Sequence, residues 1–149
     1  MDTILELSDA PEPEAEHIIS DALNAFNDGV VGYADRRPLN VLARDPETGA
    51  IIGGIHGRTS LGMLFINLVF VPERLRGSGM GTRMMRMAED EALRRGCKSG
   101  VLMTISFQAP DFYQRLGWRR FGQVDCDPPG TSRVFLSKTL SSAAQTVAT

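Results

Sequence analysis

The chain has 149 residues, of which 42% are hydrophobic, enough for one globular domain with a sizeable core. Its 16 basic and 18 acidic residues give a net charge of -2, so it lacks the basic excess that binding to a nucleic-acid backbone requires. The N-terminus lacks a signal-peptide pattern and no apolar segment is long enough to span a bilayer, which predicts a cytoplasmic protein without nucleic-acid or membrane partners.

The first half of the chain predicts four strands and one helix. Residues 3–7 alternate apolar and polar side chains, as a strand does, and residues 14–26 carry apolar side chains at helical spacing. Residues 39–44 and 50–58 flank a turn rich in Asp, Pro and Gly, which predicts a β-hairpin. The nearly continuous apolar run at 63–71 predicts a central strand covered on both faces.

From Gly79 the apolar period changes to that of a helix, which we expect to end near Arg95. One side of this helix carries methionines, alanines and a leucine. The charged side chains expected largely on its other, solvent-facing side are Arg83, Arg86, Glu89, Asp90 and Arg94.

The remainder predicts a buried strand, a short helix and a second hairpin. These elements are expected at 101–105, at 110–116, and at 118–124 with 133–138. We therefore expect one domain over residues 1–140, followed by a loose tail over residues 141–149, which are rich in Ser, Thr and Ala.

A glycine-rich loop, Arg76-Gly77-Ser78-Gly79-Met80-Gly81, joins the run at 63–71 to the helix that follows. Free N–H groups at a helix N-terminus attract anions, and glycines let a phosphate approach the main chain without meeting a Cβ. Arg76 adds a positive charge. A glycine-rich turn without a ligand is the alternative, but three alternating glycines at this junction favour a phosphate site.

Two nucleotide-binding motifs and a zinc site are disfavoured by the residues present. A Walker A loop requires Lys and then Ser or Thr after its last glycine, whereas Thr82 and Arg83 stand there. The final glycine of a dinucleotide fingerprint is replaced by Thr82 in one frame and by Met84 in the other. Cys97 and Cys126 lack zinc-ligand spacing, so no metal is expected.

The loop resembles the cofactor motif of the GNAT superfamily of N-acetyltransferases: Arg or Gln, two residues, Gly, one residue, then Gly or Ala. Arg76, Gly79 and Gly81 fill these positions. The segment from Ala109 to Trp118 is similar to a second family motif, Ala-x-x-Phe-Tyr-x-x-x-Gly-aromatic. The resemblance implies a single-domain α/β fold whose mixed, mostly antiparallel central sheet is flanked by helices and has splayed fourth and fifth strands.

The resemblance also implies an acyl-CoA-dependent N-acyltransferase that moves acetyl from acetyl-CoA to a primary amine by direct attack in a ternary complex. Acetyl-CoA would thread between the splayed strands. The residues implied to bind it are Leu68, Val69, Val71, Arg76, Gly77, Ser78, Gly79, Met80, Gly81, Thr82, Ser106, Ala109 and Phe112. The family often has Asn where Ser106 stands, which implies a weaker cofactor contact here.

Tyr113 is the implied general acid, because its phenol can protonate a leaving thiolate. Glu73, His56 and Asn67 acting through water are the candidates for the general base. We expect a small-molecule or peptide amine as the acceptor and allow for a homodimer. A catalytically silent CoA-binding sensor and a purely structural α/β domain are the alternatives, and Tyr113 favours catalysis over the sensor.

Overall fold

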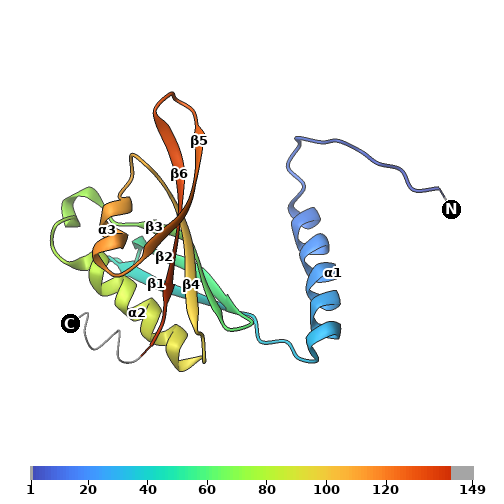
Figure 1. Cartoon of the computed structure of the whole chain (residues 1–149), viewed down its shortest axis with the longest axis horizontal. Helices are drawn as coiled ribbons and strands as arrows, with labels where there is room; N and C mark the ends of the chain where they lie inside the picture. Colours follow the sequence, from blue (N-terminus) through green and yellow to red (C-terminus); the bar gives the residue numbers. More distant parts are fainter. Residues whose placement is uncertain (1, 142–149) are drawn as a thin grey trace. The chain divides into compact units, whose positions relative to one another are not determined.

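The computed structural model describes residues 2–141 and contains three α-helices, one 3-10 turn and six strands over that range (Figure 1). Their bounds are α1 Pro13–Val31, β1 Arg37–Arg44, β2 Ile51–Ser60, β3 Met63–Phe70, η1 Glu73–Leu75, α2 Met80–Arg94, β4 Ser99–Ile105, α3 Pro110–Arg115, β5 Arg119–Cys126 and β6 Thr131–Thr139. The tail expected over residues 141–149 lies, apart from Ser141, outside the described residues. No helix within residues 2–141 is both long and apolar enough to cross a membrane.

The chain divides into two units, one up to Ala34 and one from Asp35 onward. The first unit carries α1, which begins at Pro13 and ends at Val31. The residue that caps it, Gly32, has a left-handed φ of 89°. The strand expected over residues 3–7 is wrong: the segment pairs with no strand of the described chain, and alternation without a pairing partner does not hold a strand. The domain expected over residues 1–140 spans both units and stays a prediction.

The second unit is built on a sheet with the strand order β1-β2-β3-β4-β6-β5. The pairing of β3 with β4 is parallel, and the other four pairings are antiparallel. A parallel pair needs a crossover connection, and here α2 supplies it between β3 and β4. The expected mixed, mostly antiparallel sheet is therefore confirmed.

The core of this unit lies between α2 and one face of the sheet. Met85, Ala88 and Ala92 of α2 are fully buried in one cluster with Ile55 of β2 and Leu64 of β3. Their spacing along α2 places them on one side of the helix, as the apolar stripe predicts. This packing sets the N-terminus of α2, and with it the glycine loop, at the end of β3.

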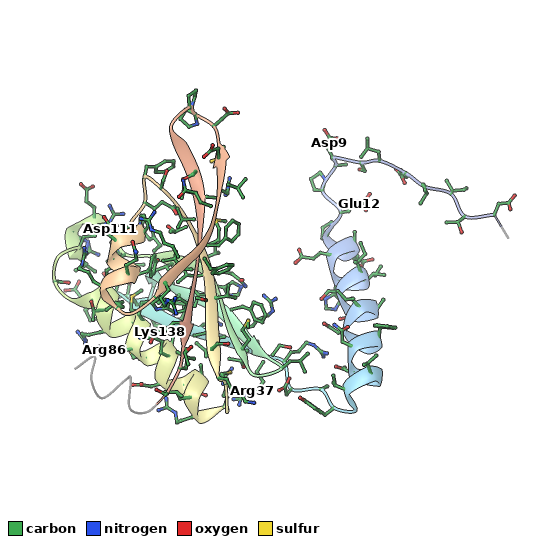
Figure 2. All side chains as sticks on the ribbon, in the orientation of Figure 1. Asp9, Glu12, Arg37, Arg86, Asp111 and Lys138 are labelled. Atoms are coloured by element: carbon green, nitrogen blue, oxygen red, sulfur yellow. The ribbon has the colours of Figure 1, made fainter. Side chains whose placement is uncertain are left out.

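One charged residue of α2 is not on the solvent-facing side. Glu89 is 1% exposed, because it follows Met85 by four positions and precedes Ala92 by three, which places it on the buried side of the helix. Its carboxylate forms an ion pair with Lys138 of β6, labelled in Figure 2, at 2.6 Å. The expectation of a solvent-facing Glu89 is therefore wrong.

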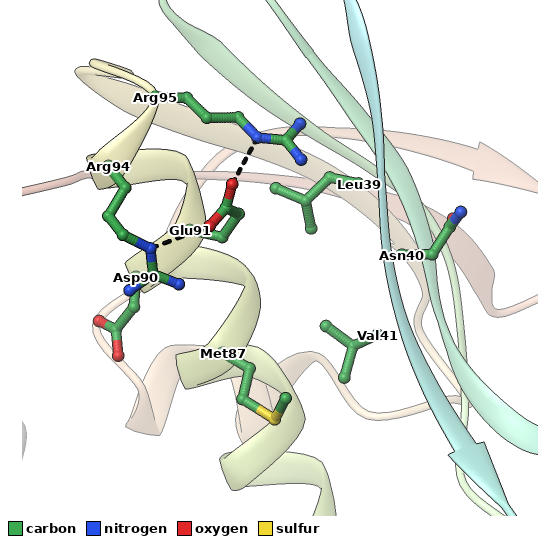
Figure 3. Close-up of a pocket in the computed structure, with 8 residues that line it drawn as sticks. All are labelled: Leu39, Asn40, Val41, Met87, Asp90, Glu91, Arg94 and Arg95. Carbon is green, nitrogen blue, oxygen red and sulfur yellow. Dashed lines mark hydrogen bonds and ion pairs between the residues drawn. The ribbon is translucent and has the colours of Figure 1, made fainter.

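A pocket lies between the C-terminal half of α2 and β1 (Figure 3). It is lined by Leu39, Asn40, Val41, Met87, Asp90, Glu91, Arg94 and Arg95. These α2 residues belong to the half of the helix opposite its N-terminal glycine loop, so this pocket is separate from the predicted phosphate site.

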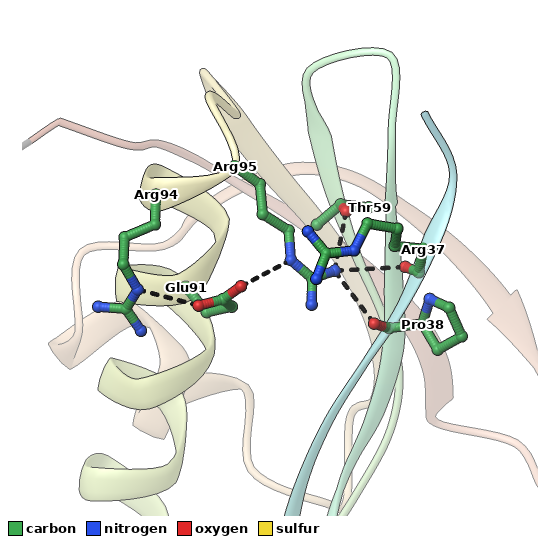
Figure 4. Close-up of polar contacts among 6 residues, drawn as sticks. All are labelled: Arg37, Pro38, Thr59, Glu91, Arg94 and Arg95. Atoms are coloured by element: carbon green, nitrogen blue, oxygen red, sulfur yellow. Dashed lines mark hydrogen bonds and ion pairs between the residues drawn. The ribbon is translucent and has the colours of Figure 1, made fainter. Parts of the chain in front are cut away.

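Arg95 fastens this end of α2 to the sheet (Figure 4). Its Nε donates to Glu91 at 2.8 Å, while its Nη1 donates to the Pro38 carbonyl at 3.0 Å and to the Thr59 hydroxyl at 3.1 Å. Hydrogen bonds lower the pKa of the Glu91 carboxyl, the one from Arg95 having the larger effect and the one from Arg94 the smaller. The arginines at this pocket are thus engaged in structural contacts.

Candidate active site

The strands β3 and β4 separate partway along their length. Their parallel register begins at Met63 with Ser99 and ends at Ile66 with Leu102, although β3 continues to Phe70 and β4 to Ile105. Alternate main-chain N–H and C=O groups of β3 beyond Ile66 face this gap rather than a neighbouring strand. The expected splay is therefore confirmed, and it lies between β3 and β4.

A β-bulge marks the point where the two strands part. On the other side of β3, His56 of β2 pairs with Leu68 but the next residue, Gly57, pairs with Ile66. Asn67 is therefore an extra residue in β3, and a bulge of this kind bends a strand and increases its twist. The bulge directs the second half of β3, with Leu68 and the half-buried Val69, away from β4.

The glycine loop follows the divergent end of β3 by way of η1. Gly77 and Gly79 have φ values of 79° and 85°, which strongly favour glycine, and Gly79 is the N-cap of α2. Apart from Gly79 itself and the residues on either side of it, no atom lies within 4 Å of the position that a Cβ on Gly79 would occupy. The N–H groups of the first turn of α2, including those of Met80 and Thr82, have no acceptor within the helix. The loop is thus an open cradle with main-chain donors, which suits a pyrophosphate.

Arg76 is held at the edge of this cradle. Its Nε donates to the Val71 carbonyl at 2.9 Å, and its guanidinium carbon lies 5.9 Å from the centroid of the Phe70 ring. The side chain is exposed, and no hydrogen bond within residues 2–141 uses its two terminal nitrogens. The bond to Val71 therefore orients the guanidinium and leaves its outer edge for an anion.

Replacing Arg76 by alanine is expected to weaken CoA binding about tenfold while changing the affinity for a pantetheine fragment without phosphates by less than about twofold. The guanidinium acts on phosphate charge, which the fragment lacks. Titration calorimetry with both ligands measures the difference, and Arg74→Ala, an exposed arginine of η1, is the matched control. Equal losses for the two ligands would assign Arg76 a structural role.

Gly81 brings the loop into contact with α3. A Cβ on Gly81 would lie 3.1 Å from the Cζ of Phe112 and 3.8 Å from a methyl group of Val71. Gly81 therefore allows the Phe112 ring to pack on the first turn of α2, in addition to any contact with a ligand. The Phe112 ring also meets Tyr113 edge-on, with ring centroids 5.1 Å apart.

Tyr113 lies on α3 and is 8% exposed. Burial raises the pKa of its phenol above the ordinary value of 10.0, since the charged phenolate is poorly solvated there. No hydrogen bond to its hydroxyl occurs within residues 2–141. The phenol is thus neutral at physiological pH and has a proton to donate.

Two further predicted residues lie between β4 and α3. Ser106 is joined to Ser132 by two bonds: its N–H donates to the Ser132 carbonyl at 2.8 Å, and its hydroxyl accepts from the Ser132 N–H at 2.9 Å. Ala109 is the exposed N-cap residue of α3. Ser106 thus ties β4 to β6, and its contact with a cofactor stays a prediction.

The candidate bases lie at different places. Glu73 is exposed in η1, and its carbonyl accepts from the N–H of Arg76 beside the glycine loop. His56 lies on β2 opposite Leu68, next to the bulge, and its Nδ1 is 2.8 Å from the Asn40 Oδ1. Of these two, His56 is the candidate nearer to the opening of the gap. Asn67, the third candidate, is the bulge residue of β3 itself.

The residues at this site suit a ligand that carries a pyrophosphate. The cradle at Gly79 has room that a Cβ would fill, and main-chain groups of β3 face the gap that begins after Ile66. No group of three or more His, Cys, Asp or Glu side chains able to hold a metal occurs in the described part of the chain.

Comparisons with known proteins agree with this geometry. The acetyltransferase (GNAT) family model matches residues 1–118. Acetyltransferase Atu2258 of Agrobacterium fabrum is 37% identical over 132 residues, which are 89% of this chain and 96% of that protein. Blasticidin-S acetyltransferase of Streptomyces morookaense is 37% identical over 109 residues, 71% of this chain and 80% of that protein.

A crystal structure from Agrobacterium tumefaciens has a TM-score of 0.84 and 36% identity to this chain, and the match covers 92% of this chain and 99% of that one. The family model and these relatives each span most of the chain. The chain therefore belongs to the GNAT family of acetyltransferases.

Proposed function

We propose that this acetyltransferase moves the acetyl group of acetyl-CoA to a primary amine by direct attack in a ternary complex. The observation that carries the proposal is the arrangement of three parts in one unit: the gap after Ile66, the open cradle at Gly79 and the buried phenol of Tyr113. The contact of Phe112 with Gly81 links the last two parts directly.

Acetyl-CoA supplies an activated acyl group as a thioester. The amine nitrogen forms a bond to the acetyl carbon, the carbon–sulfur bond breaks, and the sulfur leaves with the bonding electron pair. Main-chain N–H groups of β3 that face the gap stabilise the negative charge that develops on the acetyl oxygen. Tyr113 donates its proton to the sulfur, and a base accepts the proton that the amine loses.

His56 is the proposed base. When its Nδ1–H donates to the Asn40 oxygen, the Nε2 of the neutral imidazole retains a free lone pair. The position of His56 opposite Leu68 places it one strand away from the gap. Glu73 lies instead beside the glycine loop, where the phosphates of the cofactor would bind and no acceptor amine would need to be deprotonated.

Replacing His56 by alanine is expected to lower kcat about tenfold at neutral pH with no change in acetyl-CoA affinity. The difference in kcat between the variant and the wild type should become smaller as the pH approaches the pKa of the acceptor amine, which is about 10 for an alkyl amine. At that pH the free amine forms without the help of a base. Rate profiles against pH measure this. The matched control is His17→Ala, the other histidine, which is exposed on α1. A deficit that does not change with pH would remove His56 from the role of base.

A small-molecule amine is the acceptor class that we favour. The support is that a relative 37% identical to this chain is named for acetylation of blasticidin S. A peptide amine is the other class.

A panel of acceptors tests the proposed function. Amino acids, polyamines, aminoglycosides, blasticidin S and peptides are incubated with acetyl-CoA. Thiol release is followed, and mass spectrometry identifies the product. We expect at least one amine to release thiol above the hydrolysis background and to gain one acetyl group. Saturable acetyl-CoA binding with no thiol release on any amine would favour the silent sensor instead.

A further inference from the structure

A buried ion pair joins three elements that are distant in the sequence. Lys138 of β6 is 8% exposed, and its Nζ lies 2.6 Å from the Glu89 Oε1 of α2 and donates to the Leu116 carbonyl at 2.6 Å. The other Glu89 oxygen accepts from the Trp118 indole at 3.4 Å. Gly117 makes room for this arrangement, since a Cβ there would lie 3.3 Å from the Lys138 Cε.

The turn that this ion pair holds also fixes the main chain of Tyr113. The N–H groups of Leu116 and Trp118 both donate to the Tyr113 carbonyl at 3.0 Å. Lys138 is thus linked to the main chain of Tyr113 through Leu116, and Glu89 is linked to it through Trp118. Phe112, which directly precedes Tyr113 in α3, packs on Gly81.

The Tyr113 hydroxyl depends on these indirect contacts for its position. It has no hydrogen-bond partner of its own within residues 2–141, so its place is set by its main chain and by ring packing. A catalytic group whose supporting contacts are loosened by a fraction of an ångström loses much of its effect.

We propose that the Glu89–Lys138 pair is a positioning device for Tyr113, which holds the last turn of α3 so that the phenol meets the leaving sulfur. This inference rests on the proposed role of Tyr113 as general acid. Lys138 suits the task because its ammonium binds a carboxylate and a helix-terminal carbonyl at once, which an apolar residue of the same size cannot do.

The test replaces both charges together. A single replacement would leave one buried charge without its partner and is expected to destabilise the fold strongly. In Glu89→Gln/Lys138→Met, the amide still accepts from Trp118 and methionine fills the volume of the lysine stem, but the donor to the Leu116 carbonyl is lost. The matched control is Asp111→Asn/Arg120→Met, which removes the exposed ion pair between α3 and β5.

We expect the Glu89→Gln/Lys138→Met variant to fold cooperatively, to bind acetyl-CoA within about twofold of wild type and to lose about tenfold in kcat. The control should keep kcat within about twofold. The decisive comparison adds Tyr113→Phe: in that background the double replacement should have no further effect on kcat, because the group that it positions is gone.

Two results would overturn the inference alone: an unchanged kcat in the folded double variant, or the same tenfold loss in the Tyr113→Phe background. Full kcat in Tyr113→Phe by itself would instead remove the proposed general acid, and the inference with it. The two failures are therefore distinguishable by the single variant.

Discussion

A Gly79→Asp variant is expected to bind acetyl-CoA about 100-fold more weakly than the wild type, or not measurably. The carboxylate would occupy the open cradle at the N-terminus of α2 and repel the pyrophosphate there. The left-handed φ of 85° adds some backbone strain, but no neighbouring atom is displaced. Titration calorimetry measures the affinity, and a thermal melt reports whether the fold survives.

Two controls separate charge from shape. Gly79→Asn has nearly the same side chain without the charge, and asparagine tolerates left-handed backbone better than most residues, so it should retain at least about tenfold more affinity than Gly79→Asp. Gly49→Asp places the same residue at a φ of 75° in open space in the turn between β1 and β2, and should bind as wild type does. Equal affinities for Gly79→Asp and Gly79→Asn would argue against a phosphate at this position.

A Tyr113→Phe variant is expected to lose about 100-fold in kcat while its melting temperature and acetyl-CoA affinity stay near wild type. The ring keeps its edge-on contact with Phe112, and removal of the hydroxyl leaves no donor or acceptor of the described chain without a partner. Steady-state and single-turnover rates with a good acceptor measure the effect. Full kcat, under conditions in which chemistry limits the rate, would return Tyr113 to a packing role.

The other tyrosine and the pH profile provide the checks on this result. Tyr33→Phe removes an exposed hydroxyl of the first unit and should leave kcat unchanged. A general acid must carry its proton, and burial raises the pKa of Tyr113 above 10.0, so the midpoint of the alkaline fall in the wild-type rate should lie above that of an exposed tyrosine. The stability that the neutral phenol contributes should be lost over the same alkaline range, because the unfolded state releases this proton more readily.

Local patterns in the sequence predict the strands and helices of the second unit to within a few residues. The apolar run at 63–71 becomes β3, and the period that starts at Gly79 becomes α2. The expectation that β3 is covered on both faces is wrong for its second half, where Leu68 and Phe70 are exposed. The glycine spacing of the loop also predicts its left-handed conformation at Gly77 and Gly79. These features depend on neighbouring residues, which are visible in the sequence.

Features that depend on pairing between strands could not be predicted in this way. The bulge at Asn67 exists because β2 and β3 change register there. Asn67 is the one polar residue in the run at 63–71, but a polar residue in a strand does not by itself indicate a change of register. The alternation at residues 3–7 shows the converse, since a strand pattern alone supplies no partner strand. The role of Ser106 in joining β4 to β6 likewise depends on Ser132, 26 residues later.

The ion pair of Glu89 and Lys138 joins residues 49 positions apart and was missed. Each residue carries a signal in hindsight: Glu89 is in phase with Met85 and Ala92, and Lys138 continues the inward alternation of Val134 and Leu136. A charge at an inward position calls for a partner of opposite charge. Which residue becomes the partner of that charge depends on how the fold brings α2 and β6 together, and the local sequence does not show this.

Titration of the purified wild-type chain with acetyl-CoA tests the central claim most directly, since every proposed step requires the thioester to bind between β3 and β4 with its phosphates on the glycine loop. We predict one saturable site per chain, whose affinity falls as the salt concentration rises because phosphate charge contributes to binding. A folded wild-type chain that shows no saturable binding of acetyl-CoA at any salt concentration would contradict the account.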